Sequence, residues 1–381
     1  MHTDDDIRAW LILLRAPGVG PASLRALIAR AGSAQDACNA ARRFRGESGL
    51  SNEALSWIES PDAARLEADL TWLGQPDHHL LRFSDADFPP QLAEIAQPPA
   101  ALFVAGNPAL LLGAQIAVVG ARSASAQGLA NARGFARVFA RAGLTVTSGL
   151  ADGIDGAAHG GALDASGVTI AVIGTGADLV YPRKHRELSH RIVERGAIVS
   201  EYPLGTPARA EHFPQRNRLI AGLALGTLIV EAGLQSGSLI TARLAGEMGR
   251  EVFALPGSIH NPLARGCHRL IRDGARLTET AQEVIEALAP GAHALGAELR
   301  ARLDAAPADA SSDPRSARAD DPDYAKLLAA LGETPAGLDE LAARTGLNPA
   351  ALSSMLLLLE LEGAVGPAVN GRWQRLFVPS A

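Results

Sequence analysis

The sequence predicts an α/β protein with a Rossmann-like parallel sheet core, a helical module before the core and a winged helix after it. Between about residues 113 and 290, short β-branched runs alternate with helical segments. Helical periodicity marks residues 1–75, and residues 322–381 show three helical patterns and a Gly-rich end. Strands that are apolar on both faces and separated by helices are typical of a parallel sheet covered on both sides.

The helical module is predicted over residues 1–75, from the segments IRAWLILLRA, SLRALIARAG and NEALSWIES. Between the first two segments, the turn from Pro17 to Pro21 resembles a helix-hairpin-helix of the SAM-like kind, whose glycine amides can hold a DNA phosphate. A packing module without DNA contact explains the same pattern equally well. Prolines 76, 89, 90, 98 and 99 break regular structure, so residues 76–112 are predicted to form a connecting segment.

The core is predicted over residues 113–290, with strands at QIAVVG, LTVTSG, VTIAVIG, AIVSE, GTLIVEAG and REVFALPG. In an open α/β sheet, ligands bind at the carboxyl ends of the strands. Glycine and small hydroxyl residues follow several of these strands, and glycine lets a backbone approach an anion closely. We therefore expect a phosphate-binding crevice built from Gly120, Arg122, Ser123, Ser148, Gly149, Ser236, Gly237, Ser238 and Thr241. Helix capping is the alternative role for Ser148, Ser236, Ser238 and Thr241.

The stretch FPQRNRLIAGL, residues 213–223, combines an aromatic residue, two arginines and an apolar run. We expect Phe213 to stack on a base, and Asn217 to cap a helix while Arg216 and Arg218 reach for phosphates. The alternative is that either arginine pairs internally with Asp155 or Glu231. Under the first interpretation, Arg122→Glu and Arg216→Glu each weaken DNA binding while folding stays intact.

Charge is distributed unevenly along the chain. The net charge is −6, yet residues 183–218 hold seven Arg and one Lys against four Glu, which gives +4 there and −10 elsewhere. Such a local excess favours a polyanion as ligand. The alternative is that these charges lie on a solvated helix face and bind no ligand.

Composition also predicts where the protein works. No apolar run has the length of a membrane helix, and the acidic start MHTDDDIRAW does not resemble a signal peptide. Cys38 and Cys267 are the only cysteines, too few for a disulfide framework or a cysteine zinc cluster. We expect a cytoplasmic protein without membrane contact.

The sequence gives no support for a cofactor. The first turn of the core reads GARSAS instead of G-x-G-x-x-G, the stretch from Gly174 to Leu179 lacks the third glycine, and no P-loop occurs. Asp152, Asp155 and His159 lie close together in sequence, but we expect them to cap and orient a loop instead of binding a metal.

Residues 291–321 are dense in Ala, Asp, Ser and Pro and are predicted to form a flexible linker. Residues 322–381 are then predicted to form the winged helix. This domain holds four basic and six acidic residues, and its presumed recognition helix, NPAALSSMLLLLELEG, contains no Arg or Lys. We expect it to contact protein or pack internally, since phosphates would repel it.

Five segments together resemble the DNA-processing family DprA, also called Smf: VGAR at 119–122, SGLADGID at 148–155, IVSEYP at 198–203, FPQRNRLIAGL at 213–223 and IVEAGLQSGSLITA at 229–242. The resemblance spans about residues 115–290. It implies a protein without catalytic activity that binds single-stranded DNA without sequence preference, forms a homodimer and loads the recombinase RecA onto DNA during natural transformation. Cys267 and His268 depart from the family's usual hydroxyl and amide, and Asp152 stands where a basic residue is common.

An enzyme is the competing hypothesis, because nucleotide-processing hydrolases of the lysine-decarboxylase-like group share the general sheet plan. That group carries a P-G-G-x-G-T-x-x-E loop. The corresponding stretch here, VEAGLQSGS, lacks it. We therefore favour DNA binding over catalysis.

Overall fold

A computed structural model describes most of the chain and divides it into two compact units, Met1–Ala301 and Arg302–Ala381. The described residues are 4–43, 49–305, 322–331, 336–347, 365–368 and 372–375, together with Leu352, Met355, Leu356 and Leu359.

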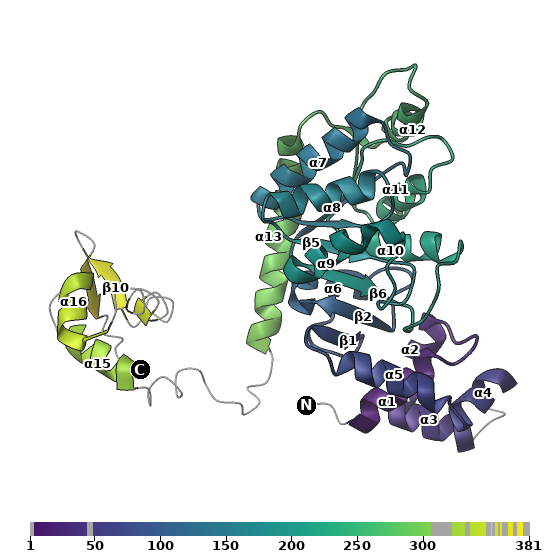
Figure 1. The fold of residues 1–381 in the computed structure, drawn as a ribbon, viewed down its shortest axis with the longest axis horizontal. Coiled ribbons are helices and arrows are strands. Elements are labelled where there is room, and N and C mark those ends of the chain that lie inside the picture. The colour runs from purple at the N-terminus through teal and green to yellow at the C-terminus, as the bar shows by residue number, and fades with distance from the viewer. Residues whose placement is uncertain are drawn as a thin grey trace. The chain divides into compact units, whose positions relative to one another are not determined.

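A nine-stranded sheet forms the centre of the first unit, in the order β1-β2-β6-β5-β4-β3-β7-β8-β9 (Figure 1). All six predicted runs form strands, and the five pairings among them are parallel, which confirms the Rossmann-like core. These strands are β3 (Gln115–Val119), β4 (Thr145–Ser148), β5 (Thr169–Val172), β6 (Ala197–Ser200), β7 (Gly226–Ile229) and β8 (Glu251–Ala254).

The strand order reverses at β3. From β3 the chain moves outward through β4 and β5 to β6, and it then returns to pair β7 with the other side of β3. The loops after β3 and β7 therefore leave the sheet in opposite directions. Such a switch point leaves a crevice at the carboxyl ends of the two strands, where open α/β sheets bind ligands.

Three strands that the sequence analysis did not anticipate extend the sheet. β1 (His78–Arg82) and β2 (Ala101–Gly106) come from the segment predicted to be an irregular connector, and they pair antiparallel next to β6. The prediction was wrong there because the prolines flank the strands instead of interrupting them. All six residues of β2 are buried, so the run ALFVAG is a strand of the sheet interior. β9 (Arg276–Leu277) completes the other edge.

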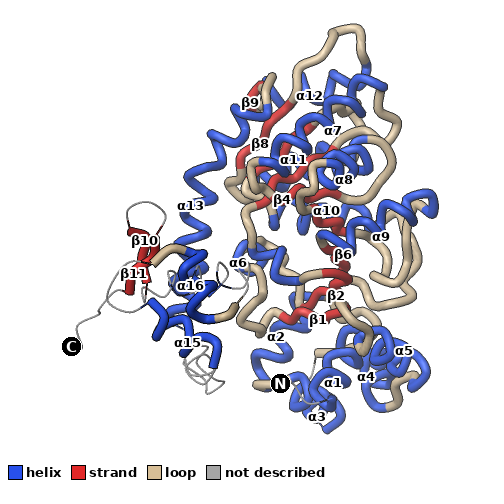
Figure 2. Tube along the Cα trace, turned by 60° about the vertical axis from the view of Figure 1, so that its left-hand side comes forward, coloured by secondary structure: helices blue, strands red, loops and turns tan. Residues whose placement is uncertain are grey.

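Helices cover both faces of the sheet (Figures 1 and 2). One face packs against α7 (Ala126–Arg141), α8 (Ile154–Asp164) and α13 (Ala281–Ala305). The other packs against α6 (Pro90–Ala93), α10 (His212–Leu223), α11 (Ser238–Glu247) and α12 (Arg265–Arg272). The remaining elements are α9 (Arg186–Arg195) and the 3-10 turns η1 (Pro108–Leu112), η2 (Arg183–His185) and η3 (Pro262–Ala264).

The linker predicted from residue 291 begins later than expected, because α13 continues to Ala305. Pro290 lies inside this helix without ending it. Leu288 and Leu295, seven residues apart and both buried, continue one apolar stripe across the proline. The rest of the expected linker, residues 306–321, lies outside the described residues.

The N-terminal helices pack against the β1–β2 side of the sheet and share a hydrophobic core with it. They are α1 (Asp4–Leu14), α2 (Pro21–Ala31), α3 (Ala34–Arg43), α4 (Asn52–Glu59) and α5 (Ala63–Leu73). Arg15 anchors them, since it donates to both carboxylate oxygens of the buried Asp69 at 2.6 Å and to the carbonyl of Leu204 at 2.9 Å. The module and the sheet therefore belong to one compact unit.

The second unit contains α15 (Pro322–Leu331), α16 (Leu338–Thr345) and an antiparallel pair, β10 (Val365–Ala368) with β11 (Arg372–Arg375). Most of the presumed recognition helix lies outside the described residues. Its four described members, Leu352, Met355, Leu356 and Leu359, are buried in this unit's core. Within the described parts of the chain, no helix is long and apolar enough to cross a membrane.

Candidate nucleic-acid interface

A crevice of about 850 Å³ lies at the switch point between β3 and β7. Its walls come from the turn after β3, the first turns of α10 and α11, and the loop after β5. Among the predicted residues, those that line it are Gly120, Arg122, Ser123, Phe213, Arg216, Asn217, Ser236, Gly237, Ser238 and Thr241. The predicted loops thus converge at one edge of the sheet.

A cation and two aromatic rings form one wall of the crevice. The exposed guanidinium of Arg122 lies over the ring of Phe213, with Cζ 5.1 Å from the ring centroid. The ring of Tyr181 is 5.6 Å from that of Phe213, and Tyr181 is 49% exposed. Sequence reasoning missed Tyr181, although an aromatic residue directly before Pro182 in the loop after β5 was a usable signal. An unpaired base and its phosphate can be held by the exposed ring of Tyr181, the half-buried ring of Phe213 and the exposed guanidinium of Arg122.

Small polar groups form the opposite wall. Ser236 and Ser238 share a hydrogen bond of 2.7 Å between their hydroxyls, and Asn217 Nδ2 donates to the carbonyl of Gly237 at 3.3 Å. Ser123 and Gly237 are exposed on the rim. Ser238 and Thr241 are buried in the first turn of α11. They therefore shape this wall more than they provide hydrogen bonds to a ligand.

Ser148 and Gly149 do not reach the crevice. Ser148 is fully buried and its hydroxyl donates to the carbonyl of Val118 at 2.7 Å, so the expected phosphate contact is wrong. Gly149 has a structural role, because a Cβ there would come within 1.8 Å of Nη1 of Arg216 and 2.7 Å of the carboxylate of Asp155. Both residues therefore help to position the loop after β4.

Arg216 lines the crevice but is almost fully buried. It is 3% exposed, and its Nη1 donates to the carbonyl of Val172 at 2.8 Å. Burial lowers the pKa of Arg216 to about 10, and the carboxylate of Asp155 opposes that shift. Asp155 in turn accepts from the amides of Gly149 at 3.1 Å and Ala151 at 3.4 Å. The near-complete burial of Arg216 does not favour the expected phosphate contact. Asp155, the internal partner considered from sequence, interacts with Arg216 electrostatically, but the two side chains form no direct ion pair in the described structure.

Arg218 is also engaged internally. It is 8% exposed, and its Nη2 donates to both oxygens of Glu201 at 2.6 and 2.7 Å. Its Nε donates to the carbonyl of Gln97 at 2.9 Å. Burial raises the pKa of Glu201, and the guanidinium of Arg218 opposes that rise. Arg218 thus joins α10 to the β2 side of the sheet and is not placed to bind a phosphate.

Asn217 does not cap a helix, because α10 already begins at His212. Starting there places Arg216, Leu219, Ile220 and Leu223 on one buried stripe, at the spacing of a core-facing helix side. The sequence pattern predicted the apolar residues of this stripe but not that Arg216 belongs to it.

The two departures from the family pattern are accommodated locally. Cys267 is buried with Sγ 3.7 Å from the carbonyl of Ile229, and burial raises the pKa of this thiol to about 11. His268 Nε2 lies 3.0 Å from the carbonyl of Gly257. The carboxylate of Asp152 is 2.9 Å from Nζ of Lys184, so it offsets one cation beside the crevice.

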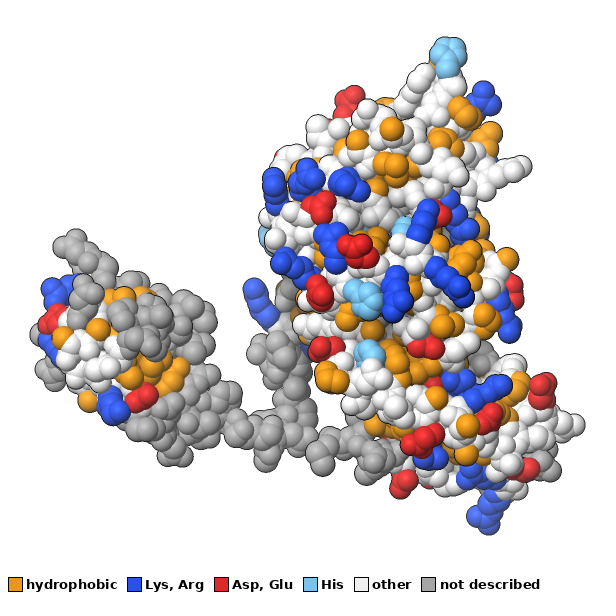
Figure 3. All heavy atoms as spheres, in the orientation of Figure 1, with side chains coloured by type: hydrophobic (Ala, Val, Ile, Leu, Met, Phe, Trp, Pro, Cys, Tyr) orange, Lys and Arg blue, Asp and Glu red, His pale blue; other side chains and the backbone are white. Residues whose placement is uncertain are grey.

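Basic side chains gather over α7, α8 and α9, with acidic ones among them (Figure 3). Several cations of residues 183–218 have carboxylate partners: Lys184 with Asp152, Arg191 with Asp164, and Arg218 with Glu201. The local charge excess seen in the sequence is therefore partly neutralised. Among the described residues that line the crevice, Arg122 is the exposed cation.

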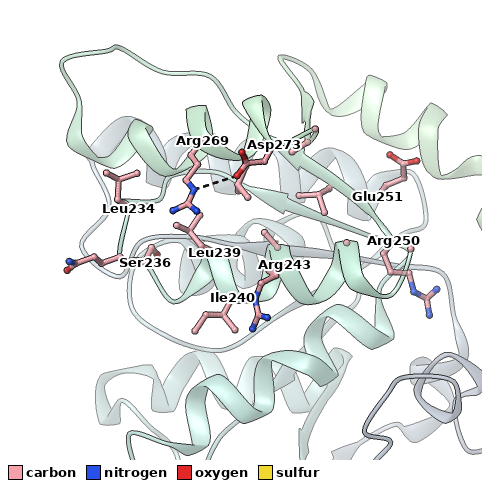
Figure 4. A pocket seen from close by; sticks show the side chains of 17 residues that line it. Leu234, Ser236, Leu239, Ile240, Arg243, Arg250, Glu251, Arg269 and Asp273 are labelled. Carbon is pink, nitrogen blue, oxygen red and sulfur yellow. Dashed lines mark ion pairs between the residues drawn. The ribbon is translucent and has the colours of Figure 1, made fainter.

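A second hollow, of about 790 Å³, lies between α11, α12 and β8 (Figure 4). Its arginines also have partners: Arg243 with Glu247 at 2.9 Å, Arg269 with Asp273 at 3.5 Å, and Arg250 with the carbonyl of Gly222 at 3.4 Å. Its other walls include Leu239 and Ile240. Paired charges and apolar walls suit a polyanion less well than the crevice at the switch point.

Three family models match the chain in the order of its parts. The DprA-like N-terminal HHH domain matches residues 4–57, and the DprA winged helix domain matches residues 310–368. The DNA recombination-mediator protein A family matches residues 79–289, which is more than half of the chain. The chain belongs to the DprA/Smf family.

Individual relatives of the DprA/Smf family agree with this assignment. Protein Smf of Escherichia coli is 44% identical over 312 residues, covering 82% of this chain and 81% of that protein. The crystal structure of DprA from Streptococcus pneumoniae matches with a TM-score of 0.64 and 35% identity, over 73% of this chain and 97% of that one. A Helicobacter pylori DprA structure, described by its single-stranded DNA binding mode, matches with a TM-score of 0.51 and 28% identity, over 56% and 96% of the two chains.

Proposed function

We propose that this protein binds single-stranded DNA without sequence preference in the crevice at the β3–β7 switch point. The observation that carries the proposal is the exposed Arg122 guanidinium over the ring of Phe213, 5.1 Å from its centroid, beside the exposed Tyr181. Nonspecific single-strand binding combines cations along the backbone with aromatic faces for successive bases. The DprA relative from H. pylori, described as binding single-stranded DNA, supports the same ligand.

The open shape of the site favours a strand over a duplex. Tyr181 and Phe213 present ring surface that a stacked, paired base cannot use, while an unpaired base can. The helices that carry several arginines, α7, α9 and α12, contribute no residue to the lining of this crevice. We therefore expect tighter binding to oligo-dT than to a duplex of equal length.

Arg122→Ala is expected to weaken binding of labelled oligo-dT by about 10-fold or more, since a charge-assisted hydrogen bond contributes about 1.5–3 kcal/mol. The plot of log K against log salt should become shallower by about 0.7, the value for one phosphate contact on a single strand. Fluorescence anisotropy at several salt concentrations measures both quantities. Arg141→Ala, at the far end of α7, is the matched control and should bind as the wild type does. Unchanged affinity in Arg122→Ala would place the groove elsewhere.

Phe213→Ala is expected to weaken oligo-dT binding by about 1–3 kcal/mol, the contribution of one base stack. The salt dependence should stay as in the wild type, because no phosphate contact is removed. Phe213→Trp retains a stacking surface and should restore most of the affinity. The same anisotropy titration distinguishes the two variants. A loss in Phe213→Trp equal to that in Phe213→Ala contradicts a stacking role.

We propose in addition that the protein acts in the cytoplasm as a homodimer and loads RecA onto the bound strand, without catalysing a reaction. The homodimer, the RecA loading and the lack of catalysis rest on the DprA/Smf family resemblance, and the cytoplasmic location rests on the composition of the chain. Support for self-association comes from the edge strand β9, where Leu277 is 50% exposed beside an open sheet edge. Light scattering of the purified chain tests the dimer, and a monomer at micromolar concentration would contradict it. RecA filament assembly on oligo-dT, measured with and without this protein, tests loading, and equal assembly rates would contradict it.

The competing hypothesis is an enzyme that acts on a nucleotide. Mononucleotide turnover, assayed beside the oligo-dT titration, separates the two functions. Turnover without oligonucleotide binding would reverse the proposal.

A further inference from the structure

The N-terminus of α7 is where a doubly wound sheet commonly holds a ligand phosphate, because this helix follows the strand at the switch point. In this chain a protein carboxylate lies there. Glu231 follows β7, is 8% exposed, and accepts from the amide of Ser125 at 2.8 Å and from the Ser125 hydroxyl at 2.6 Å. Asn261 Nδ2 is a further donor, at 3.4 Å.

The partners of Glu231 are those that a bound phosphate would use. Backbone N–H and hydroxyl donors at a helix N-terminus stabilise an anion through hydrogen bonds and through the partial positive charge of the helix end. In the described part of the chain no lysine or arginine forms an ion pair with this carboxylate. Its charge is therefore held by the helix end, as that of a ligand would be.

Neighbouring glycine makes room for this arrangement. Gly128 lies in the first turn of α7, where a Cβ would come within 2.4 Å of the Glu231 carboxylate. Gly134, farther along the same helix, has nothing within 4 Å of a Cβ built there. Of these two glycines, only Gly128 therefore leaves space that the Glu231 carboxylate needs.

We propose that Glu231 is a specificity-determining residue that closes the α7 N-terminus to the phosphates of free nucleotides. The carboxylate occupies the volume and the donors of that site, and its charge repels a second anion. The contact that remains for a phosphate is Arg122 on the exposed rim. A DNA strand can follow this rim, whereas this one contact is not enough to hold a small nucleotide. This inference rests on the proposed function, because it explains why the crevice accepts a polymer and not a mononucleotide.

Titration with inorganic phosphate, at constant ionic strength, tests the proposal on the full chain. Glu231→Ala removes the carboxylate, and Glu231→Gln keeps its size and its acceptor oxygen while removing its charge, so the second variant serves if the first fails to fold. Glu247→Gln, which changes an exposed glutamate on α11, is the matched control. Binding is followed by the amide resonances of Ser125 and Gly128 and by calorimetry, and ADP is then titrated in the same way.

We expect phosphate to bind the Glu231 variants at least 10-fold more tightly than the wild type or Glu247→Gln, with shifts at Ser125 and Gly128. Equal binding to the wild type, with the same shifts, overturns the proposal because the site would be open. Absence of binding in every variant overturns it too, because the carboxylate would not be what excludes phosphate. Oligo-dT affinity is measured on the same samples. A wild type that fails to bind oligo-dT refutes the proposed function whatever the phosphate titration shows.

Discussion

Arg216→Met is expected to lower the free energy of unfolding of the first unit by about 1–3 kcal/mol, because it removes the hydrogen bond to the buried carbonyl of Val172 and a cation that interacts with the buried Asp155. Arg216 is 3% exposed and Asp155 is 7% exposed, so the remaining carboxylate would have little access to water. Its hydrogen bonds from Gly149 and Ala151 would remain, but the nearby cation would not. Urea denaturation followed by tryptophan fluorescence measures the change, since Trp10, Trp57 and Trp72 lie in this unit.

A double-mutant cycle isolates the pair. Asp155→Asn together with Arg216→Met should be more stable than the sum of the two single changes predicts, by about 1–3 kcal/mol. Arg122→Met is the matched control, because the same change at an exposed arginine should alter stability by less than about 0.5 kcal/mol while weakening oligo-dT binding. Wild-type stability in Arg216→Met would contradict the importance of the buried pair.

This prediction replaces the one that the sequence supports. In the sequence Arg122 and Arg216 look alike, so their replacement by glutamate is expected to weaken binding and leave folding intact. In the structure, Arg216→Glu would place a second carboxylate beside the buried Asp155, and we expect the fold to be lost. The two arginines differ in their surroundings, not in their residue type.

The strands of the core could be predicted because each is a short buried run whose residues are apolar on both faces. The carboxyl ends of β3 and β7 were therefore located correctly, and with them the turn that carries Arg122. β2 was missed although its run is as apolar as the others, because nearby prolines suggested irregular structure. Local composition was a poorer guide there than the length of the apolar run.

The interior partners of the site could not be predicted, because they come from distant parts of the chain. Arg216 meets the carbonyl of Val172 from β5 and the carboxylate of Asp155 from α8. The start of α10 decided which way Arg216 points, because the helix begins at His212 and not after the predicted cap at Asn217. Tyr181 was missed for a related reason, since its place beside Phe213 depends on how two loops meet.

His159 is expected to make the fold lose stability in mild acid. Its ring is fully buried on α8, and Nδ1 lies 2.7 Å from the hydroxyl of Thr169, which itself donates to the carbonyl of Val146 at 2.6 Å. The Thr169 hydroxyl has one proton, and it is used in the bond to Val146. In the neutral ring of His159, Nδ1 therefore carries the hydrogen and Nε2 is unprotonated. Nε2 has no partner among the described residues, so a proton added there would be a buried charge without an acceptor.

Burial, with smaller contributions from His185 and Arg216, lowers the pKa of His159 to about 3. An unfolded histidine titrates near 6.5, so between about pH 6.5 and pH 3 the unfolded chain binds a proton that the folded chain does not. Stability therefore falls as pH falls through this window, by about 2 kcal/mol between pH 7 and pH 5 from this residue. His159→Asn keeps a donor near the place of Nδ1 and removes the titration. At pH 7 its free energy of unfolding should be lower than that of the wild type. The difference between the two proteins should shrink by about 2 kcal/mol between pH 7 and pH 5.

Other groups also titrate over this range, so the informative quantity is the difference between variants. His190→Asn changes an exposed histidine on α9 and should follow the wild-type curve in parallel. Urea denaturation at half-unit steps from pH 7 to pH 5 supplies the three curves. If His159→Asn also runs parallel to the wild type, the buried ring is not what senses the acid. Convergence in that variant alone means that burial on α8 keeps His159 neutral in the folded protein.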